Sequence, residues 1–76
     1  MKADEIRILL KATPFKSFTV YMPSEKSFRV PHPDFAWLTP NGRTLIVAPA
    51  GSGGVDMLDV PLIARVEVQQ TSAAGS

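Results

Sequence analysis

Cysteine is the first residue type that this chain of 76 residues lacks. Its absence excludes a disulfide framework, a thiolate metal site and a cysteine nucleophile. Small secreted domains usually depend on disulfides, so the composition favours a reducing, cytoplasmic location. A chain of this length buries only about 60% of its unfolded surface, which leaves a thin core and makes any partner surface important.

Histidine is nearly absent as well, because His32 is the only one. A metal site needs several His, Cys, Asp or Glu ligands, so a chain with one histidine is a poor candidate. Asp34 could orient the imidazole, but an Asp–His pair without a nucleophile is an incomplete catalytic arrangement. Pro31 and Pro33 instead make the stretch VPHP a rigid corner between two half-strands. We therefore expect no enzyme activity, no metal and no cofactor.

The sequence also lacks a dominant charge and a long apolar run. Its net charge is +1, and scattered cations do not form the electrostatic footprint of a nucleic-acid-binding protein. Near the N-terminus, Asp4 and Glu5 stand where a signal peptide would be basic, and Arg7 and Lys11 interrupt the apolar stretch. We expect no signal peptide, no membrane span and no membrane partner. The basic residues are Lys2, Arg7, Lys11, Lys16, Lys26, Arg29, Arg43 and Arg65.

The apolar residues recur at helical spacing near the N-terminus and at every second position after Pro14. The stretch ADEIRILLKATP, residues 3–14, predicts one helix that Pro14 ends. Ile6, Leu9 and Leu10 fall on one face of this helix, and Ile8 points away from it. A helix this short is marginal in water, so we expect it to dock on the rest of the domain.

The remaining segments predict five short antiparallel strands, the second of them bent or broken at the VPHP corner. Pro23 suits the second position of a turn between the first two strands. Asn41-Gly42 predicts a two-residue hairpin turn, and the stretch PAGSGG, residues 49–54, predicts a loop. The strand segments are SFTVYM (17–22), SFRV continuing into DFAWLT (27–39), RTLIVA (43–48), VDMLDV (55–60) and ARVEVQ (64–69).

These elements predict a mainly β, α+β fold in a single domain over residues 1–69, with a disordered tail over residues 70–76. The N-terminal helix precedes a five-stranded, strongly bent antiparallel sheet or a small SH3/Sm-like barrel. Both a closed barrel and an open sheet fit the pattern. Phe35 and Trp37 fit two roles as well, either ordinary core or an aromatic platform for a ligand.

Several apolar residues fall outside the expected core pattern. Leu58 and Val60 face away from Val55 and Met57, and Ile63 is out of phase with the last strand. In a domain with a thin core, such residues indicate burial between subunits, so we expect a homo-oligomer or an unidentified protein partner. The candidate interaction surface comprises Ile8, Arg29, His32, Trp37, Arg43, Leu58, Val60 and Ile63.

Two resemblances accompany this interpretation. The stretch LLKATPFKSFTVYMPSEKSFRVPHPDFAWL resembles a group of short bacterial proteins of uncharacterised function, which share Pro-Phe-x-x-Phe and Val-Pro-His-Pro-[Asp/Glu]-Phe. This resemblance implies no activity. The order of elements is also similar to that of the Sm-like proteins, which form rings through their fourth and fifth strands and bind RNA. It implies an alternative function, an RNA-binding small barrel, for which Arg29, Arg43 and Trp37 are the candidate residues.

Overall fold

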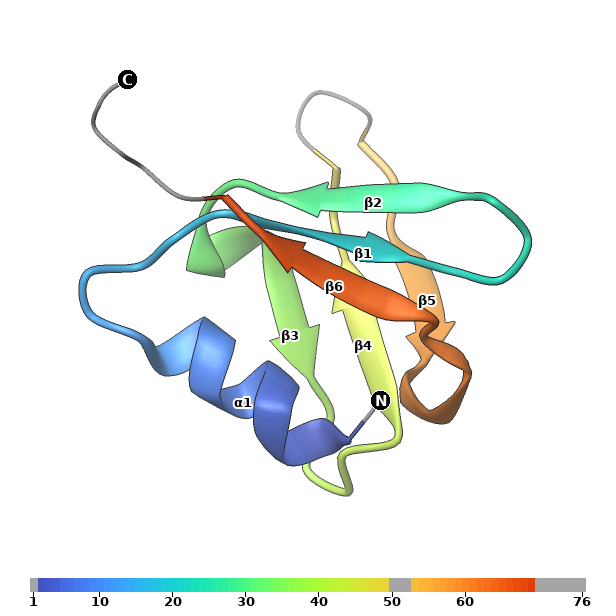
Figure 1. Cartoon of the computed structure of the whole chain (residues 1–76), viewed down its shortest axis with the longest axis horizontal. Helices are drawn as coiled ribbons and strands as arrows, with labels where there is room; N and C mark the ends of the chain where they lie inside the picture. Colours follow the sequence, from blue (N-terminus) through green and yellow to red (C-terminus); the bar gives the residue numbers. More distant parts are fainter. Residues whose placement is uncertain (1, 50–52, 70–76) are drawn as a thin grey trace.

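The computed structural model describes residues 2–49 and 53–69. They form an α+β fold in which one helix accompanies six strands (Figure 1). The expected tail over residues 70–76 and the middle of the glycine loop, residues 50–52, lie outside the described residues. The elements are α1 (Ala3–Lys11), β1 (Phe18–Tyr21), β2 (Ser27–Val30), η1 (Pro33–Phe35), β3 (Ala36–Leu38), β4 (Thr44–Val47), β5 (Asp56–Asp59), η2 (Val60–Leu62) and β6 (Arg65–Val68).

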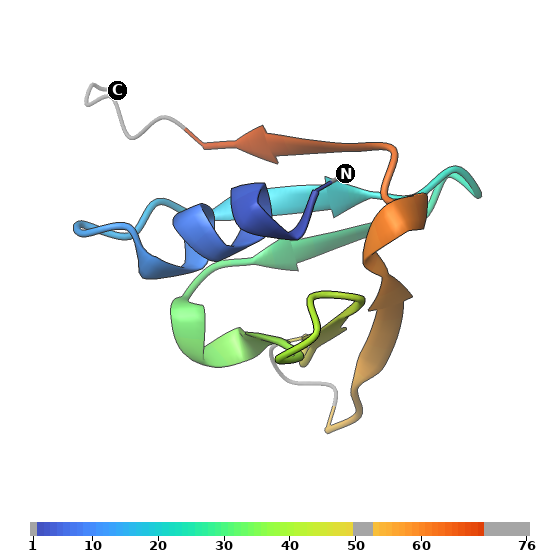
Figure 2. The same cartoon turned by 90° about the horizontal axis from the view of Figure 1, so that it is seen from below.

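The strands form two three-stranded antiparallel sheets, ordered β2–β1–β6 and β3–β4–β5. The expected single five-stranded sheet or closed barrel is therefore wrong. The predicted second strand is in fact two strands, β2 and β3, which belong to different sheets because the 3-10 helix η1 separates them. The second 3-10 helix, η2, makes the other passage between the sheets. Figure 2 shows both passages as short coils at the ends of the strands.

The inner faces of both sheets meet in one apolar core. In the first sheet, Phe18 lies between Val30 and Val68, and Val20 lies between Phe28 and Val66, as the alternating pattern predicted. Helix α1 packs next to β3 and adds its predicted apolar face, while Ile8 stays exposed. The fully or nearly fully buried residues are Ile6, Phe18, Val20, Val30, Ala36, Leu45, Val47, Leu58, Val60 and Ile63.

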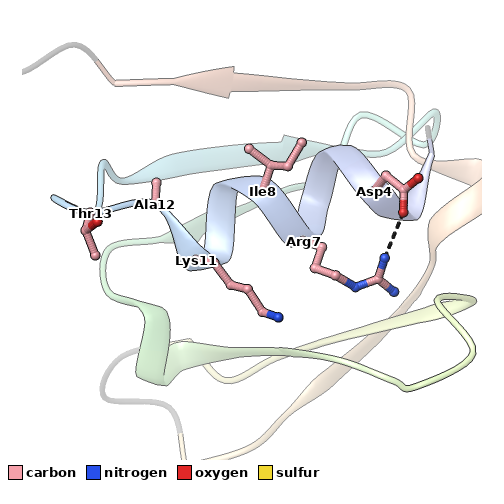
Figure 3. Close-up of a pocket in the computed structure, with 6 residues that line it drawn as sticks. All are labelled: Asp4, Arg7, Ile8, Lys11, Ala12 and Thr13. Carbon is pink, nitrogen blue, oxygen red and sulfur yellow. Dashed lines mark hydrogen bonds and ion pairs between the residues drawn. The ribbon is translucent and has the colours of Figure 1, made fainter.

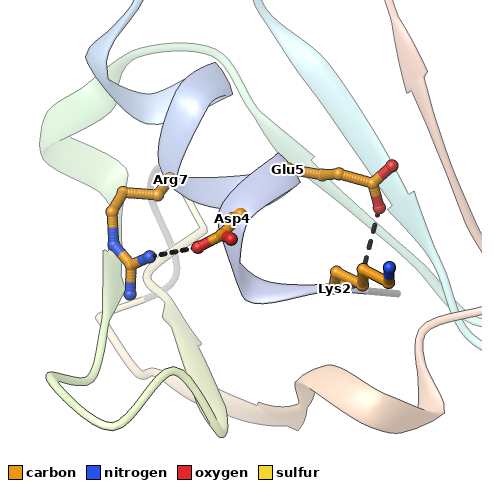
Figure 4. Close-up of polar contacts among 4 residues, drawn as sticks. All are labelled: Lys2, Asp4, Glu5 and Arg7. Atoms are coloured by element: carbon orange, nitrogen blue, oxygen red, sulfur yellow. Dashed lines mark hydrogen bonds and ion pairs between the residues drawn. The ribbon is translucent and has the colours of Figure 1, made fainter.

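Charged side chains support the first turn of α1 (Figure 4). The backbone N–H of Lys2 donates to the carboxylate of Glu5 (3.3 Å), and Arg7 donates to the carboxylate of Asp4 (2.8 Å). Both carboxylates lie near the positive end of the helix dipole, which favours them there. These contacts fix where the helix begins and hold Arg7 on the side that faces β3.

In each of the two hairpins, one turn residue has a positive φ angle: Glu25 in the first and Gly42 in the second. The N–H of Glu25 donates to the carbonyl of Met22 (3.1 Å), which confirms Pro23 at the second position of the first turn. In the second hairpin only Gly42 has a positive φ, +74°, and Thr39 pairs with Thr44. The predicted two-residue turn is wrong: four residues, 40–43, lie between the hydrogen-bonded pair Thr39 and Thr44, and the Thr39 hydroxyl also accepts the Thr44 N–H.

The predicted exposure of three residues of the interaction surface, all in or next to η2, is wrong. Leu58, Val60 and Ile63 are buried in the core of the chain, so they expose no surface to a partner. Leu58 lies opposite Leu45 on the inner face of β5. Val60, the first residue of η2, continues the inner face of Leu58, and the 3-10 turn then brings Ile63 back into the core.

Candidate interaction surface

His32 occupies the corner between β2 and β3. The backbone N–H of Asp34 donates to its Nδ1 (3.3 Å), so the imidazole caps the N-terminus of η1. Its ring lies against two phenylalanines, with centroid distances of 6.4 Å to Phe15 and 6.3 Å to Phe35. The sequence suggested that Asp34 could orient the imidazole. The hydrogen bond runs from the Asp34 amide to Nδ1, the Asp34 carboxylate lies 3.6 Å from the same nitrogen, and the contacts around His32 are those of a corner residue.

The outer face of the β2–β1–β6 sheet is polar. The Tyr21 hydroxyl donates to Glu67 (3.0 Å), and the guanidinium of Arg65 lies 4.0 Å from the centre of the Tyr21 ring. Arg29 of β2 lies on the same face, opposite Thr19. This face contains cross-strand polar contacts of the kind that stabilise a solvated sheet surface.

The outer face of the β3–β4–β5 sheet is apolar instead. Trp37 lies directly opposite Ile46, and Ile46 lies opposite Met57, so the three residues form a row across all three strands. We call them the apolar row. Trp37 is 50% exposed and Met57 is 70% exposed, and Val55, just before β5, is exposed as well. The outer face of this sheet therefore differs in character from the polar outer face of the β2–β1–β6 sheet.

The predicted surface residues therefore divide into separate groups. Ile8 and Trp37 are exposed as expected. Arg29 lies on the polar outer face of the other sheet, and Arg43 is exposed where the β3–β4 loop ends. Trp37 is part of an exposed face rather than the core, and Phe35 lies partly buried in η1, so the two rings do not form one platform on a strand.

The structure also brings together two cations and an aromatic ring that sequence analysis did not connect. A groove of about 340 Å³, the α1–β3 groove, is lined by Arg7, Leu10 and Lys11 from the helix and by residues 36–40 of β3 and the loop after it. The spacing of Arg7 and Lys11, one helical turn apart, placed them on one face. Their position beside Trp37 depends on how α1 docks, which the local pattern does not contain.

A broader hollow of about 640 Å³ lies along α1 and shares Arg7 and Lys11 with the groove (Figure 3). All its lining residues come from α1 and the two residues after it: Asp4, Arg7, Ile8, Lys11, Ala12 and Thr13. With no second element opposite, this hollow is an open helix face. Ile8 is its main apolar side chain.

Comparisons with known proteins give no match, whether with protein-family models, curated proteins or solved structures. The described residues contain no group of three or more His, Cys, Asp or Glu side chains that could hold a metal ion. Among the helices of the described segments, none has the length and apolar character needed to cross a bilayer.

Proposed function

We propose that this chain is a non-enzymatic interaction module that associates with a second copy of itself through β5 and the apolar row. The contrast between the two outer sheet faces carries this proposal. One face has paired polar side chains, whereas the other presents Trp37 and Met57 to solvent, with the partly buried Ile46 in register between them. An exposed apolar residue gains stability when another subunit covers it, and pairing at β5 would cover Met57, the most exposed residue of the row.

The backbone of β5 supports the choice of a second copy. The Val60 N–H donates to the Arg43 carbonyl (2.9 Å), in register with the β4–β5 pairs. Backbone groups of alternate residues point to opposite strand edges, so Leu58 faces β4 whereas Met57 and Asp59 direct their N–H and C=O groups to the free edge. An edge with unpaired groups pairs readily with another strand.

The residues of β5 suit a two-fold axis at Met57. An antiparallel copy centred there places Met57 opposite its equivalent and Asp59 opposite Val55, so no carboxylate faces another. The apolar row then continues across six strands. A shift of one residue would place an outer side chain opposite an inner one. A centre at Leu58 would extend the pairing to Pro61, which has no N–H to donate.

Sedimentation equilibrium over a hundredfold range of micromolar dilutions tests the proposal. We expect a mass of twice the 8.2 kDa of the chain, falling to the monomer in Met57→Glu, which places carboxylates at the axis. Ser27→Glu, an equal change on an exposed position of the other sheet, should leave the dimer intact. A mass of 8.2 kDa throughout would refute self-association. An unchanged dimer in Met57→Glu would refute this interface.

Two further proposals have less support. The cysteine-free composition supports a cytoplasmic location. RNA binding by a small Sm-like domain is the alternative function, supported by the order of the elements. It gains little from the cations, because Arg29 and Trp37 lie on the outer faces of different sheets.

A further inference from the structure

The edge of β3 that faces α1 has backbone groups with no strand beside them. The N–H of Thr39 donates to Thr44 (2.9 Å) and the N–H of Ala48 donates to Phe35 (2.8 Å). Alternate residues 35, 37 and 39 therefore face β4, and Ala36 and Leu38 direct their N–H and C=O groups the other way. Both residues line the α1–β3 groove.

Unpaired backbone groups cost more free energy at this edge than at an ordinary exposed strand edge, because water reaches them less. Ala36 is only 3% exposed, and the part of the chain that the structure describes gives its outward backbone groups no partner. Backbone polar groups that are shielded from water cost free energy unless they are hydrogen-bonded. A ligand that supplies a carbonyl and an N–H at strand spacing would meet this need.

The side chains of the groove indicate the charge of that ligand. Figure 3 shows Arg7 and Lys11 pointing from α1 toward the ribbon of β3. Arg7 is paired with Asp4 at 2.8 Å, whereas Lys11 has no ion pair among the described residues. Trp37 adds a half-exposed aromatic surface at the same groove. The groove therefore combines a strand edge, an aromatic side chain and an excess of positive charge.

We infer that the α1–β3 groove binds an extended acidic peptide, which adds to the edge of β3 as a further strand. In this mode main-chain hydrogen bonds supply the affinity and side-chain contacts supply the specificity. The peptide's carboxylates lie near Lys11, and its apolar side chains contact Trp37. The inference deepens the proposed interaction function. It shares Trp37 with the apolar row but uses the edge opposite β5, so hydrogen exchange at β3 and the measured mass test the two proposals separately.

Amide hydrogen exchange by NMR, with two capped hexapeptides as probes, tests the inference. Acetyl-EVEVEV-amide should slow exchange at Ala36 and Leu38 by about tenfold or more, because their N–H groups become hydrogen-bonded. Thr39, already bonded to Thr44, serves as the internal reference. Acetyl-KVKVKV-amide should bind more weakly. Emission from Trp37, the only tryptophan, should change over the same titration.

Charge variants distinguish binding at the groove from non-specific electrostatic attraction to the whole domain. Lys11→Glu should weaken binding of the acidic peptide by about fivefold, the scale of an exposed ion pair. Lys16→Glu changes the charge equally at an exposed site outside the groove and should weaken it less than about twofold. Equal losses in the two variants would refute the inference, as would unchanged exchange at Ala36 and Leu38. Tighter binding of a ten-nucleotide oligouridylate would refute it too and favour RNA as the ligand. Whatever the result, the measured mass still decides self-association.

Discussion

Replacing Gly42 by alanine should remove about 1–4.5 kcal/mol of unfolding free energy, for two separate reasons. Gly42 has a φ of +74°, where an L-residue costs about 1–2 kcal/mol. An ideal Cβ at this position would lie 2.7 Å from the Cβ of Ala3 in α1, well inside a normal contact of about 3.5–4.0 Å. Such overpacking costs about 1–3 kcal/mol. The stiffer unfolded chain offsets about 0.4–1 kcal/mol.

Gly53→Ala provides the matched control. Gly53 has nearly the same φ, +76°, but its ideal Cβ meets nothing within 4 Å. Gly53→Ala should therefore lose only the cost of the backbone conformation, about 1 kcal/mol of unfolding free energy. Urea unfolding at 25 °C, with the slope held equal between variants, measures both changes. The double variant Ala3→Gly/Gly42→Ala should recover part of the contact cost, because the opposing Cβ is gone.

Equal losses in Gly42→Ala and Gly53→Ala, within about 0.5 kcal/mol, would refute the close approach of the β3–β4 loop to α1. A failure of Ala3→Gly to rescue Gly42→Ala would place the cost in the backbone alone. For a domain of this size, whose total stability is about 4–11 kcal/mol, the predicted loss is large enough to measure without ambiguity.

Three further predictions concern single side chains. Glu25 has a φ of +69°, so Glu25→Gly should raise stability by about 0.5–1 kcal/mol in a thermal melt, and a loss would contradict the turn geometry. Leu45→Ala should cost about 2–5 kcal/mol in urea unfolding because Leu45 is fully buried, whereas Ile8→Ala, at a residue 68% exposed, should cost less than about 0.5. His32→Ala should cost about 0.5–2 kcal/mol by removing the cap on the Asp34 N–H, and His32→Asn should restore most of it; an equal loss in both would exclude the capping role.

The predictions that succeeded rest on local patterns. The alternation of Phe18, Val20, Phe28 and Val30 assigns each residue of the first hairpin to a face, and the structure has those faces. The helical period likewise predicted the buried face of α1 and the exposure of Ile8. Where one face of an element is clearly more apolar than the other, periodicity determines which side chains are buried.

The predictions that failed concern a segment with apolar residues on both faces and a break in the period. Leu58 and Val60 share one face and Val55 and Met57 share the other, so alternation alone does not say which face is buried. Ile63 is out of phase with the last strand because the 3-10 turn of η2 precedes it. Trp37, Ile46 and Met57 form a row only because of the register between β3, β4 and β5. That register depends on the four-residue loop before Thr44 and on packing, neither of which local propensity specifies.

The pairing of β1 with β6 has a consequence for synthesis on the ribosome. Phe18 and Val68 are partners in the first sheet, so β1 lacks its second neighbour until nearly all the described chain has been translated. Until then, the hairpin of β1 and β2 is a two-stranded unit, which is marginally stable in water, and the edge of β1 is open to other chains. Chaperone dependence should therefore be highest for ribosome-bound chains that end before Arg65, and release of β6 should relieve it.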